Sequence, residues 1–242
     1  MMCHLEPPNH TMPLRVPFGC YIPLDRSYGG FNMTASTPIS GTKSQALTRI
    51  IDLVGRGYTR YMSGNIKAAK VAHLANKFHQ MFCIGATPAQ RITRKKHGIA
   101  NTALVIYVPE AADRVNWLLL ATAGSGLEAE TLVDVTDRKR LQFAGYEIVR
   151  YPFEGRTRWT WRRPKAEMAE HYILLADLAG KRAWGAVGEL LTRLANQPGF
   201  HGVREQTWAL CQEARRRGYS GDLPHLYYMQ KIAHGESLRL GA

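Results

Sequence analysis

Two short apolar segments in the middle of the chain, TALVIYV at 102–108 and RVNWLLLATAG at 114–124, most constrain its fold. Each has the length of a β-strand and is far short of the ~20 apolar residues that a membrane-spanning helix needs. The connection between them, PEAAD, suits a hairpin or a short crossover. We therefore expect these strands to form part of a sheet, and we expect no membrane partner.

Helical patterns precede these strands. Leu47, Ile50 and Val54 recur at helical spacing in SQALTRIIDLVGRG, and the glycines that follow predict the end of this helix. YTRYMSG is a candidate for a short strand. NIKAAKVAHLANKFHQMFCIG predicts a second helix, with Asn65 as its N-cap and Gly85 at its end.

The second half of the chain predicts a hairpin and then a helical region. A helix is expected around Leu127 to Lys139, after a glycine-rich turn. RLQFAGYEIVRYPF and RTRWTWRR flank a turn at Glu154 and Gly155, which is the clearest hairpin of the sequence. From Pro164 onward three segments have helical periodicity, and the tail after Gly218 resembles a loop.

These elements predict an α+β fold. We expect a mostly antiparallel sheet with helices on one face, for which a ferredoxin-like arrangement is one form, and a C-terminal helical region. Residues 44–163 form the expected nucleic-acid-binding core, and residues 164–242 form helices packed on it. Residues 1–43 are dense in proline and glycine and predict an extended or disordered arm, which could instead become ordered on nucleic acid or a partner. Met33 offers an alternative start of the chain.

Charge is the most informative part of the composition. The chain has 32 Lys and Arg residues against 19 Asp and Glu, a formal net charge of +13 and an isoelectric point near 9.8. Such an excess attracts polyanions, and nucleic acid is the polyanion that we expect. Between Leu53 and Pro109 there is no acidic residue. The candidate phosphate-binding residues in this span are Arg56, Arg60, Lys67, Lys70, Lys77, Arg91, Arg94, Lys95 and Lys96.

The densest basic stretch, TPAQRITRKKHGIAN at 87–101, predicts a short helix. Thr87 is the expected N-cap, Pro88 occupies the first helical position and Gly98 lies just past the end. Because no acid compensates these cations, we expect one continuous basic ridge across this helix and the preceding one. The alternative is an ordinary solvated charge run.

A second basic cluster, RTRWTWRRP, alternates arginines with tryptophans. In a strand, Arg158 and Arg162 share one face, while Trp159 and Trp161 share the other. Exposed tryptophans could stack on bases, but we expect both indoles to be buried under the C-terminal helices. Arg158 and Arg162 would then extend the basic surface. A third and less specific cluster is formed by Arg215, Arg216 and Arg217.

Signals for catalysis are weak, so we assign no catalytic residue, metal site or cofactor. The acids Glu128, Glu130, Asp134 and Asp137 include a DRK tripeptide similar to the (D/E)-x-K element of restriction-type nucleases. Such a tripeptide is common, and it lacks a preceding strand acid. Residues 91–97 fit the R-x5-H spacing of metal-independent ribonucleases. That alternative would use Arg91 or one of His73, His79 and His97.

The four cysteines indicate a reducing compartment. Cys3, Cys20, Cys83 and Cys211 are scattered and form no C-x-x-C pair, so we expect reduced thiols in a cytoplasmic protein.

Two segments of the sequence resemble those of other proteins. GYTRYMSGNIKAAKVAHLANKF, with the basic QRITRKKHGIANTALVIY after it, and the C-terminal PGFHGVREQ resemble uncharacterised basic proteins of bacterial plasmids and integrative conjugative elements. The resemblance covers roughly Gly57 to Arg217 and leaves the N-terminal arm outside. It implies a mobile-element protein that handles DNA or RNA, and no catalytic residues to carry over.

Taken together, these signals predict a non-enzymatic nucleic-acid-binding protein of a bacterial mobile genetic element, acting as a subunit of a nucleoprotein complex. Its partners would be DNA or RNA and other protein subunits. Two alternatives remain open: a metal-independent endoribonuclease of the type that processes CRISPR RNA, and a protein-interaction adaptor whose basic face docks an acidic partner.

Overall fold

The computed structural model describes residues 36–110, 113–228 and 236–239, and its centre is a six-stranded mixed sheet. The strands follow the order β5-β2-β4-β3-β1-β9, and only the pairing of β1 with β3 is parallel among the described strands. The α+β class and the mostly antiparallel sheet are therefore confirmed. The strands are β1 (Ser36–Ser40), β2 (Arg60–Lys67), β3 (Thr102–Tyr107), β4 (Arg114–Ala121), β5 (Val133–Asp134) and β9 (Glu236–Arg239).

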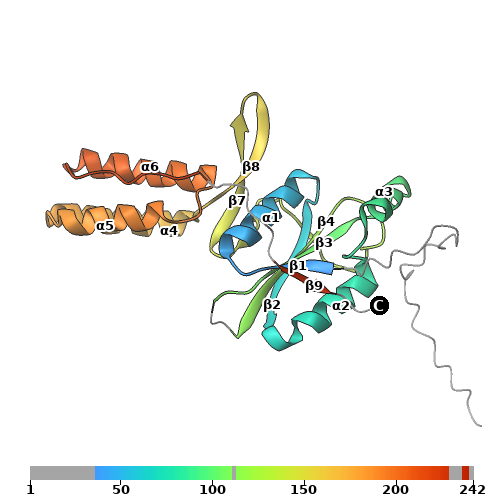
Figure 1. The fold of residues 1–242 in the computed structure, drawn as a ribbon. Helices are drawn as coiled ribbons and strands as arrows, with labels where there is room; N and C mark the ends of the chain where they lie inside the picture. Colours follow the sequence, from blue (N-terminus) through green and yellow to red (C-terminus); the bar gives the residue numbers. More distant parts are fainter. Residues whose placement is uncertain (1–35, 111–112, 229–235, 240–242) are drawn as a thin grey trace, which may run out of the picture.

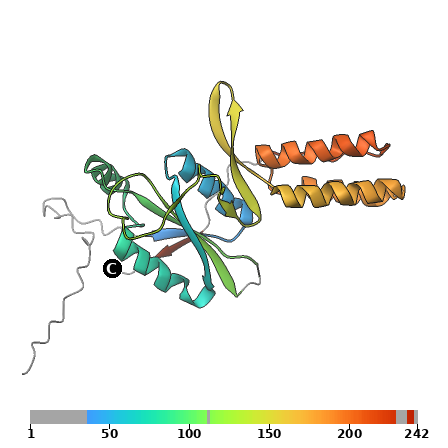
Figure 2. The ribbon, with the colours of Figure 1, turned by 180° about the vertical axis from the view of Figure 1, so that it is seen from behind.

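Helices cover both faces of this sheet, whereas we expected them on one. Helix α1 (Lys43–Gly55) packs on the face that carries Val105 and Leu118. Helix α2 (Val71–Phe82) packs on the opposite face, which carries Leu104 and Leu119, and Figures 1 and 2 show the two helices on either side of the strands. A strand with one solvated face alternates apolar and polar residues, but β3 is continuously apolar from Ala103 to Ile106 because both of its faces are buried.

The sheet does not have the ferredoxin-like arrangement. The described elements begin in the order β-α-β-α-α-β-β, whereas that fold follows β-α-β-β-α-β. Strand β1 lies within the range expected to be an arm, and it pairs in parallel with β3 and antiparallel with β9 near the C-terminus. Short stretches of residues 1–43 and of the C-terminal tail are thus strands of the sheet; the rest of the expected arm, residues 1–35, lies outside the described residues.

The boundary between β2 and α2 differs from the expectation. Strand β2 is longer than YTRYMSG predicts, and Asn65 lies inside it rather than capping a helix. Its side-chain amide donates to the Oδ1 of Asn116 on β4 at 3.0 Å. A short 3₁₀ turn (Ala68–Lys70) then leads into α2, so the helix begins five residues later than a helix capped by Asn65 would.

A second, three-stranded sheet contains the predicted hairpin. It comprises β6 (Gln142–Phe143), β7 (Tyr146–Phe153) and β8 (Arg156–Arg162), in the order β6-β7-β8. Glu154 and Gly155 form the turn with φ of 49° and 71°, which is the backbone that a two-residue hairpin loop needs. The helix expected around Leu127 to Lys139 is absent from this described stretch, where turns and β5 stand instead.

The three predicted C-terminal helices form a bundle with its own core. They are α4 (Lys165–Gly180), α5 (Trp184–Ala195) and α6 (His201–Arg216). Leu175, Leu191 and Leu210 pack together at the centre of the bundle. Figure 1 shows the bundle projecting away from the main sheet. It meets the core at its base, where Phe200 and Val203 join the buried cluster that contains α1 and Trp161 of β8.

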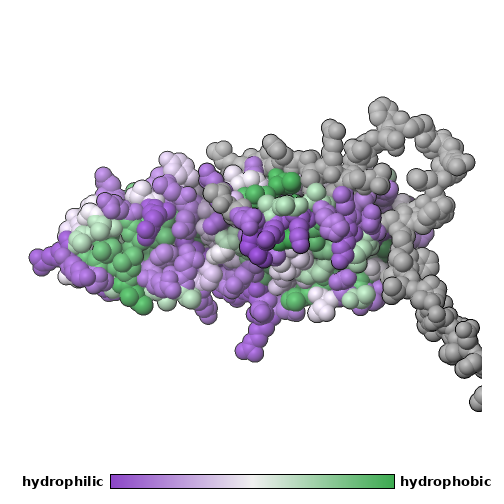
Figure 3. Space-filling model, turned by 90° about the horizontal axis from the view of Figure 1, so that it is seen from below, coloured by the Kyte–Doolittle hydropathy of each residue, from purple (hydrophilic) through white to green (hydrophobic). Residues whose placement is uncertain are grey.

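The bundle also carries exposed apolar side chains. Ile173 of α4 is 70% exposed and Trp208 of α6 is 51% exposed. Figure 3 shows hydrophobic residues gathered on the bundle. Exposed apolar surface of this kind is typical of protein contacts.

The cysteines only partly match the expectation of four reduced thiols. Cys211 is a free thiol, buried in the bundle. Cys83, just after α2, is disulfide-bonded, so the expectation is wrong for this residue. None of the helices in the described part of the chain is long and apolar enough to cross a membrane.

Candidate nucleic-acid interface

Strand β2 separates the predicted basic residues into two groups at opposite ends of the main sheet. Arg60 begins this strand and Lys67 ends it. At about 3.3 Å per residue, these two positions lie about 23 Å apart. The predicted basic residues are therefore spread along the sheet rather than gathered at one place.

One group, which we call the lysine end, consists of Lys67, Lys70 and Arg114. Lys67 pairs with Arg114 in the register of β2 and β4, so both lie at this end of the sheet. The connection between β3 and β4, which carries Glu110 and Asp113, lies at the same end, and the backbone amide of Ala68 donates to the carbonyl oxygen of Asp113 at 2.9 Å. Charges of both signs are therefore mixed here. Lys77 lies between the two ends, exposed on α2.

The other group, which we call the arginine end, gathers around the start of β2. Arg60 of β2 pairs with Ala121 of β4, and Ala121 pairs with Thr102, the first residue of β3. The segment that precedes β3 in the chain therefore lies at the same end of the sheet as Arg60. That segment includes α3 (Pro88–Lys96), the helix predicted from the densest basic stretch. The arginine end consists of Arg49, Arg56, Arg60, Arg91, Arg94, Lys95 and Lys96.

Helix α3 buries none of its side chains. Polar contacts hold it instead: Thr87 and Gln90 form a capping box, with hydrogen bonds of 2.8 and 3.3 Å. Arg94 donates from Nη2 to the carbonyl oxygen of Ala100 at 2.7 Å, and Asn101 donates from Nδ2 to the carbonyl oxygen of Arg91 at 3.0 Å. A helix anchored in this way leaves Lys95 and Lys96 exposed to solvent.

Arg49 is a member of this group that the sequence reasoning missed. Its Nε and the Nε of Arg91 are buried and have no hydrogen-bond partner in the described part of the chain. Burial, followed by the charges of Arg91 and Arg56, lowers the pKa of Arg49 to about 10, and Asp52 offsets this only in part. The guanidinium is still charged at pH 7, so an anion bound here would relieve the repulsion.

A signal for Arg49 was present in the sequence. Arg49 and Arg56 are seven residues apart, which is close to two helical turns, so they lie on one side of α1. The proximity of both to Arg91 could not be read from spacing, because it depends on how α1 and α3 are placed around the sheet.

Carboxylates approach two positions of the arginine end. Asp52 partly offsets the repulsion at Arg49, and Arg60 lies opposite Asp134 in the pairing of β2 with β5. None of Arg56, Arg91, Lys95 and Lys96 forms an ion pair with a carboxylate of the described residues. These four cations are therefore available to meet an anion.

The arginines of β8 do not extend this surface as expected. The Nε of Arg162 lies 2.6 Å from Oε1 of Glu147, and Arg158 lies over the ring of Phe153 with its Nη2 3.8 Å from Oε2 of Glu154. The charge of Arg162 is thus compensated, and that of Arg158 only weakly because this pair is exposed. The burial of Trp161 is confirmed, whereas Trp159 is half-buried beneath Arg150.

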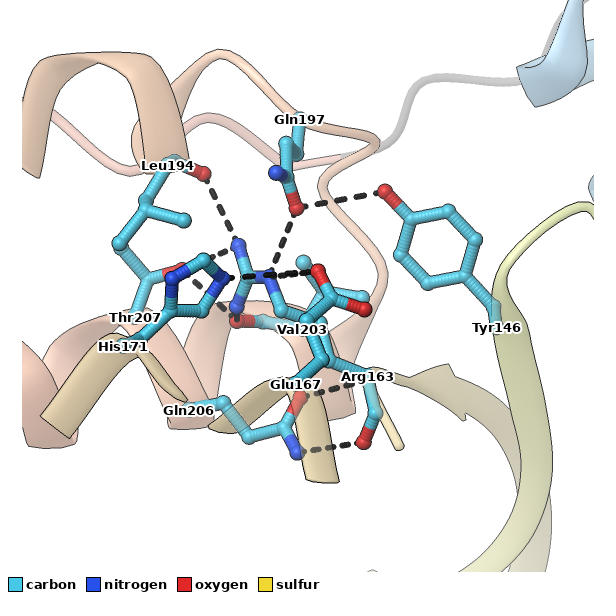
Figure 4. A network of polar contacts seen from close by, with 9 residues as sticks. All are labelled: Tyr146, Arg163, Glu167, His171, Leu194, Gln197, Val203, Gln206 and Thr207. Atoms are coloured by element: carbon cyan, nitrogen blue, oxygen red, sulfur yellow. Dashed lines mark hydrogen bonds and ion pairs between the residues drawn. The ribbon is translucent and has the colours of Figure 1, made fainter. Parts of the chain in front are cut away.

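Arg163, the next residue along this strand, has a structural role. It is fully buried and donates to the side chains of Gln197 (2.7 Å) and Thr207 (3.0 Å) and to the carbonyl oxygens of Leu194 (3.1 Å) and Val203 (3.2 Å). Figure 4 shows this network where the strand enters the bundle. In the third cluster, Arg216 and Arg217 are both paired with Glu213.

The residues considered for catalysis are spread over α2, α3 and the loop around β5. His73 is exposed on α2, and His97 is the C-cap of α3. The acids of the DRK region bind their own loop, since Asp134 accepts from the amide and the hydroxyl of Thr136, both at 2.7 Å. No group of three or more metal-ligating side chains occurs among the residues that the structure describes.

Comparisons with known proteins add nothing to this geometry. No family model, no curated protein and no solved structure matches this chain.

Proposed function

We propose that this chain binds nucleic acid through the arginine end. The observation that carries the proposal is the set of cations on α1 and α3 that no described carboxylate pairs with, beside two guanidinium groups whose buried Nε atoms lack acceptors. Phosphate groups of a nucleic-acid backbone supply the anionic oxygens that such a surface accepts.

The rest of the molecule supports a role within a larger assembly. The exposed apolar residues of the bundle, among them Ile173 and Trp208, offer a surface for a protein partner. Together with the resemblance to plasmid and conjugative-element proteins, this leads us to propose a subunit of a nucleoprotein complex of a mobile genetic element.

Two triple variants test the placement of the interface. Arg56→Ala, Lys95→Ala and Lys96→Ala together remove three charges from the arginine end and leave its anchoring hydrogen bonds, those of Arg94 and Asn101, in place. Lys67→Ala, Lys70→Ala and Lys77→Ala remove the same charge elsewhere. Fluorescence anisotropy with single- and double-stranded DNA and RNA, at two salt concentrations, gives the affinity and its salt dependence.

We expect the first variant to bind nucleic acid at least ten-fold more weakly. The slope of log affinity against log salt concentration should also become shallower by about one for each phosphate that is no longer bound. The second variant should show a smaller change. Equal losses would mean that only net charge matters, and absence of binding by the natural chain would refute the proposal. Labelled RNA incubated with the protein in EDTA should stay intact; cleavage would support the ribonuclease alternative instead.

A further inference from the structure

A pocket of about 610 Å³ lies beside the edge of the main sheet, where β5 pairs with β2. Its apolar wall includes Tyr61 of β2 and Val133 of β5, which are paired in the register of the two strands and so share a face. Ser63 adds a hydroxyl group, and the loop before β6 adds Arg138, Lys139 and Arg140. The volume is in the range of small-molecule sites, which combine apolar walls with a few polar groups.

The loop that supplies these cations is held by its own acids. Besides its bonds to Thr136, Asp134 accepts from the hydroxyl of Thr59 at 3.3 Å, and Asp137 accepts from the amide of Asp134 at 3.3 Å. The DRK tripeptide therefore uses its carboxylate to shape the loop, while its two cations line the pocket. This division of roles suits an anionic ligand rather than a metal ion.

The remaining carboxylate of the pocket wall, Glu147, is already compensated. Arg140 and Arg162 both contact its Oε1, at 3.1 and 2.6 Å. Arg138 and Lys139 are exposed, and neither forms an ion pair with a carboxylate of the described residues. The pocket thus has a positive rim next to an apolar wall.

We propose that this pocket binds one nucleotide. Arg138 and Lys139 contact its phosphate, the base lies against Tyr61 and Val133, and Ser63 is placed to hydrogen-bond the sugar or base. The ligand can be a free nucleotide or the terminal nucleotide of a strand. The inference does not rest on the proposed nucleic-acid interface, because a free nucleotide needs only the pocket.

Calorimetric titration of the full chain with AMP, ATP, adenosine and inorganic phosphate tests this pocket. We expect AMP and ATP to bind in the micromolar range, and adenosine and phosphate, which each lack half of the ligand, to bind at least ten-fold more weakly. No binding of either nucleotide at millimolar concentration would overturn the proposal, as would equal affinity for phosphate alone.

Variants locate the binding. Arg138→Ala with Lys139→Ala, and separately Ser63→Glu, should each weaken AMP binding at least ten-fold, since one removes cations and the other adds a repelling charge at an exposed strand position. Lys67→Ala with Lys70→Ala is the matched control and should leave AMP binding unchanged. Equal weakening by the control would place the ligand elsewhere and overturn the proposal.

A competition experiment identifies the source of the nucleotide. If ATP displaces a 5′-phosphorylated oligonucleotide, the pocket accepts the end of a strand; if both bind together, it accepts a free nucleotide. The triple variant of the arginine end leaves the pocket unchanged, so it should still bind AMP and should bind the oligonucleotide more weakly. Loss of AMP binding in this variant would contradict the pocket, and intact oligonucleotide binding would contradict the interface. The failures of the two proposals are therefore separable.

Discussion

The indole Nε1 of Trp161 donates a hydrogen bond of 2.9 Å to the carbonyl oxygen of Leu47, 114 residues earlier in the chain. The bond joins the smaller sheet to helix α1, and both side chains are fully buried in one core cluster. The hairpin and the main sheet are therefore fixed to each other by packing as well as by chain connectivity.

Trp161→Phe should lower the free energy of unfolding by about 2–3 kcal/mol, through the missing hydrogen bond and the cavity left by the smaller ring. Trp159→Phe is the matched control, because Trp159 is only half-buried beneath Arg150, and it should cost less than about 1 kcal/mol. Urea unfolding followed by circular dichroism measures both. Similar losses in the two variants would show that the hydrogen bond to Leu47 contributes little.

Arg163→Met should destabilise the chain by about 3–5 kcal/mol, because it removes a buried cation that joins four residues and each of its acceptors loses one hydrogen bond. Leu194 is affected directly, since its carbonyl oxygen lies in the last turn of α5 and would keep only backbone donors just past the helix, such as the amide of Gln197 at 3.4 Å. Arg163→Lys should recover only part of the loss, because an ammonium group cannot reproduce the planar arrangement of donors. Denaturant unfolding of both variants is the measurement, and full recovery by lysine would contradict this account.

Arg49→Met should stabilise the protein by about 1–2 kcal/mol, which is opposite to the usual effect of changing a buried residue. The substitution keeps the length of the side chain and removes a guanidinium whose pKa is lowered to about 10 by burial and by Arg91 and Arg56. It should also weaken nucleic-acid binding. Arg56→Met, at an exposed position, should change stability by less than about 0.5 kcal/mol. A clear loss of stability in Arg49→Met would show that this arginine has a structural partner.

Stability should fall between about pH 10 and pH 12 because of Tyr146. Burial raises the pKa of this phenol to about 12, above its usual value of about 10. A raised folded-state pKa stabilises the fold fully below the unfolded pKa, and this contribution is lost as pH rises through the folded one. Tyr146→Phe should therefore lose less stability across this range, by about 1–3 kcal/mol. Thermal unfolding of the natural chain and of Tyr146→Phe at pH 9, 10, 11 and 12 is the measurement. If the midpoint temperatures of the two chains fell in parallel with pH, Tyr146 would not be the group responsible.

The sequence by itself determined the elements whose signals lie between near neighbours. The capped helix α3 follows from Thr87, Pro88 and Gly98, and the hairpin follows from alternation on both sides of Glu154 and Gly155. The burial of Trp161 follows from the same alternation. Capping, helical periodicity and turn geometry act over a few residues, so the order of the sequence contains them.

Only the tertiary structure decided which of these elements meet. Strand β1 pairs with β3 and β9, which come from distant parts of the chain, and a short stretch rich in serine and threonine gives no local sign of that partnership. The cations of one acid-free segment were divided between two ends of β2, while Arg49, outside that segment, joined one of the groups. Electrostatic interactions depend on distance in space, and that distance is fixed by strand pairing and by burial of both faces of the sheet, neither of which local spacing determines.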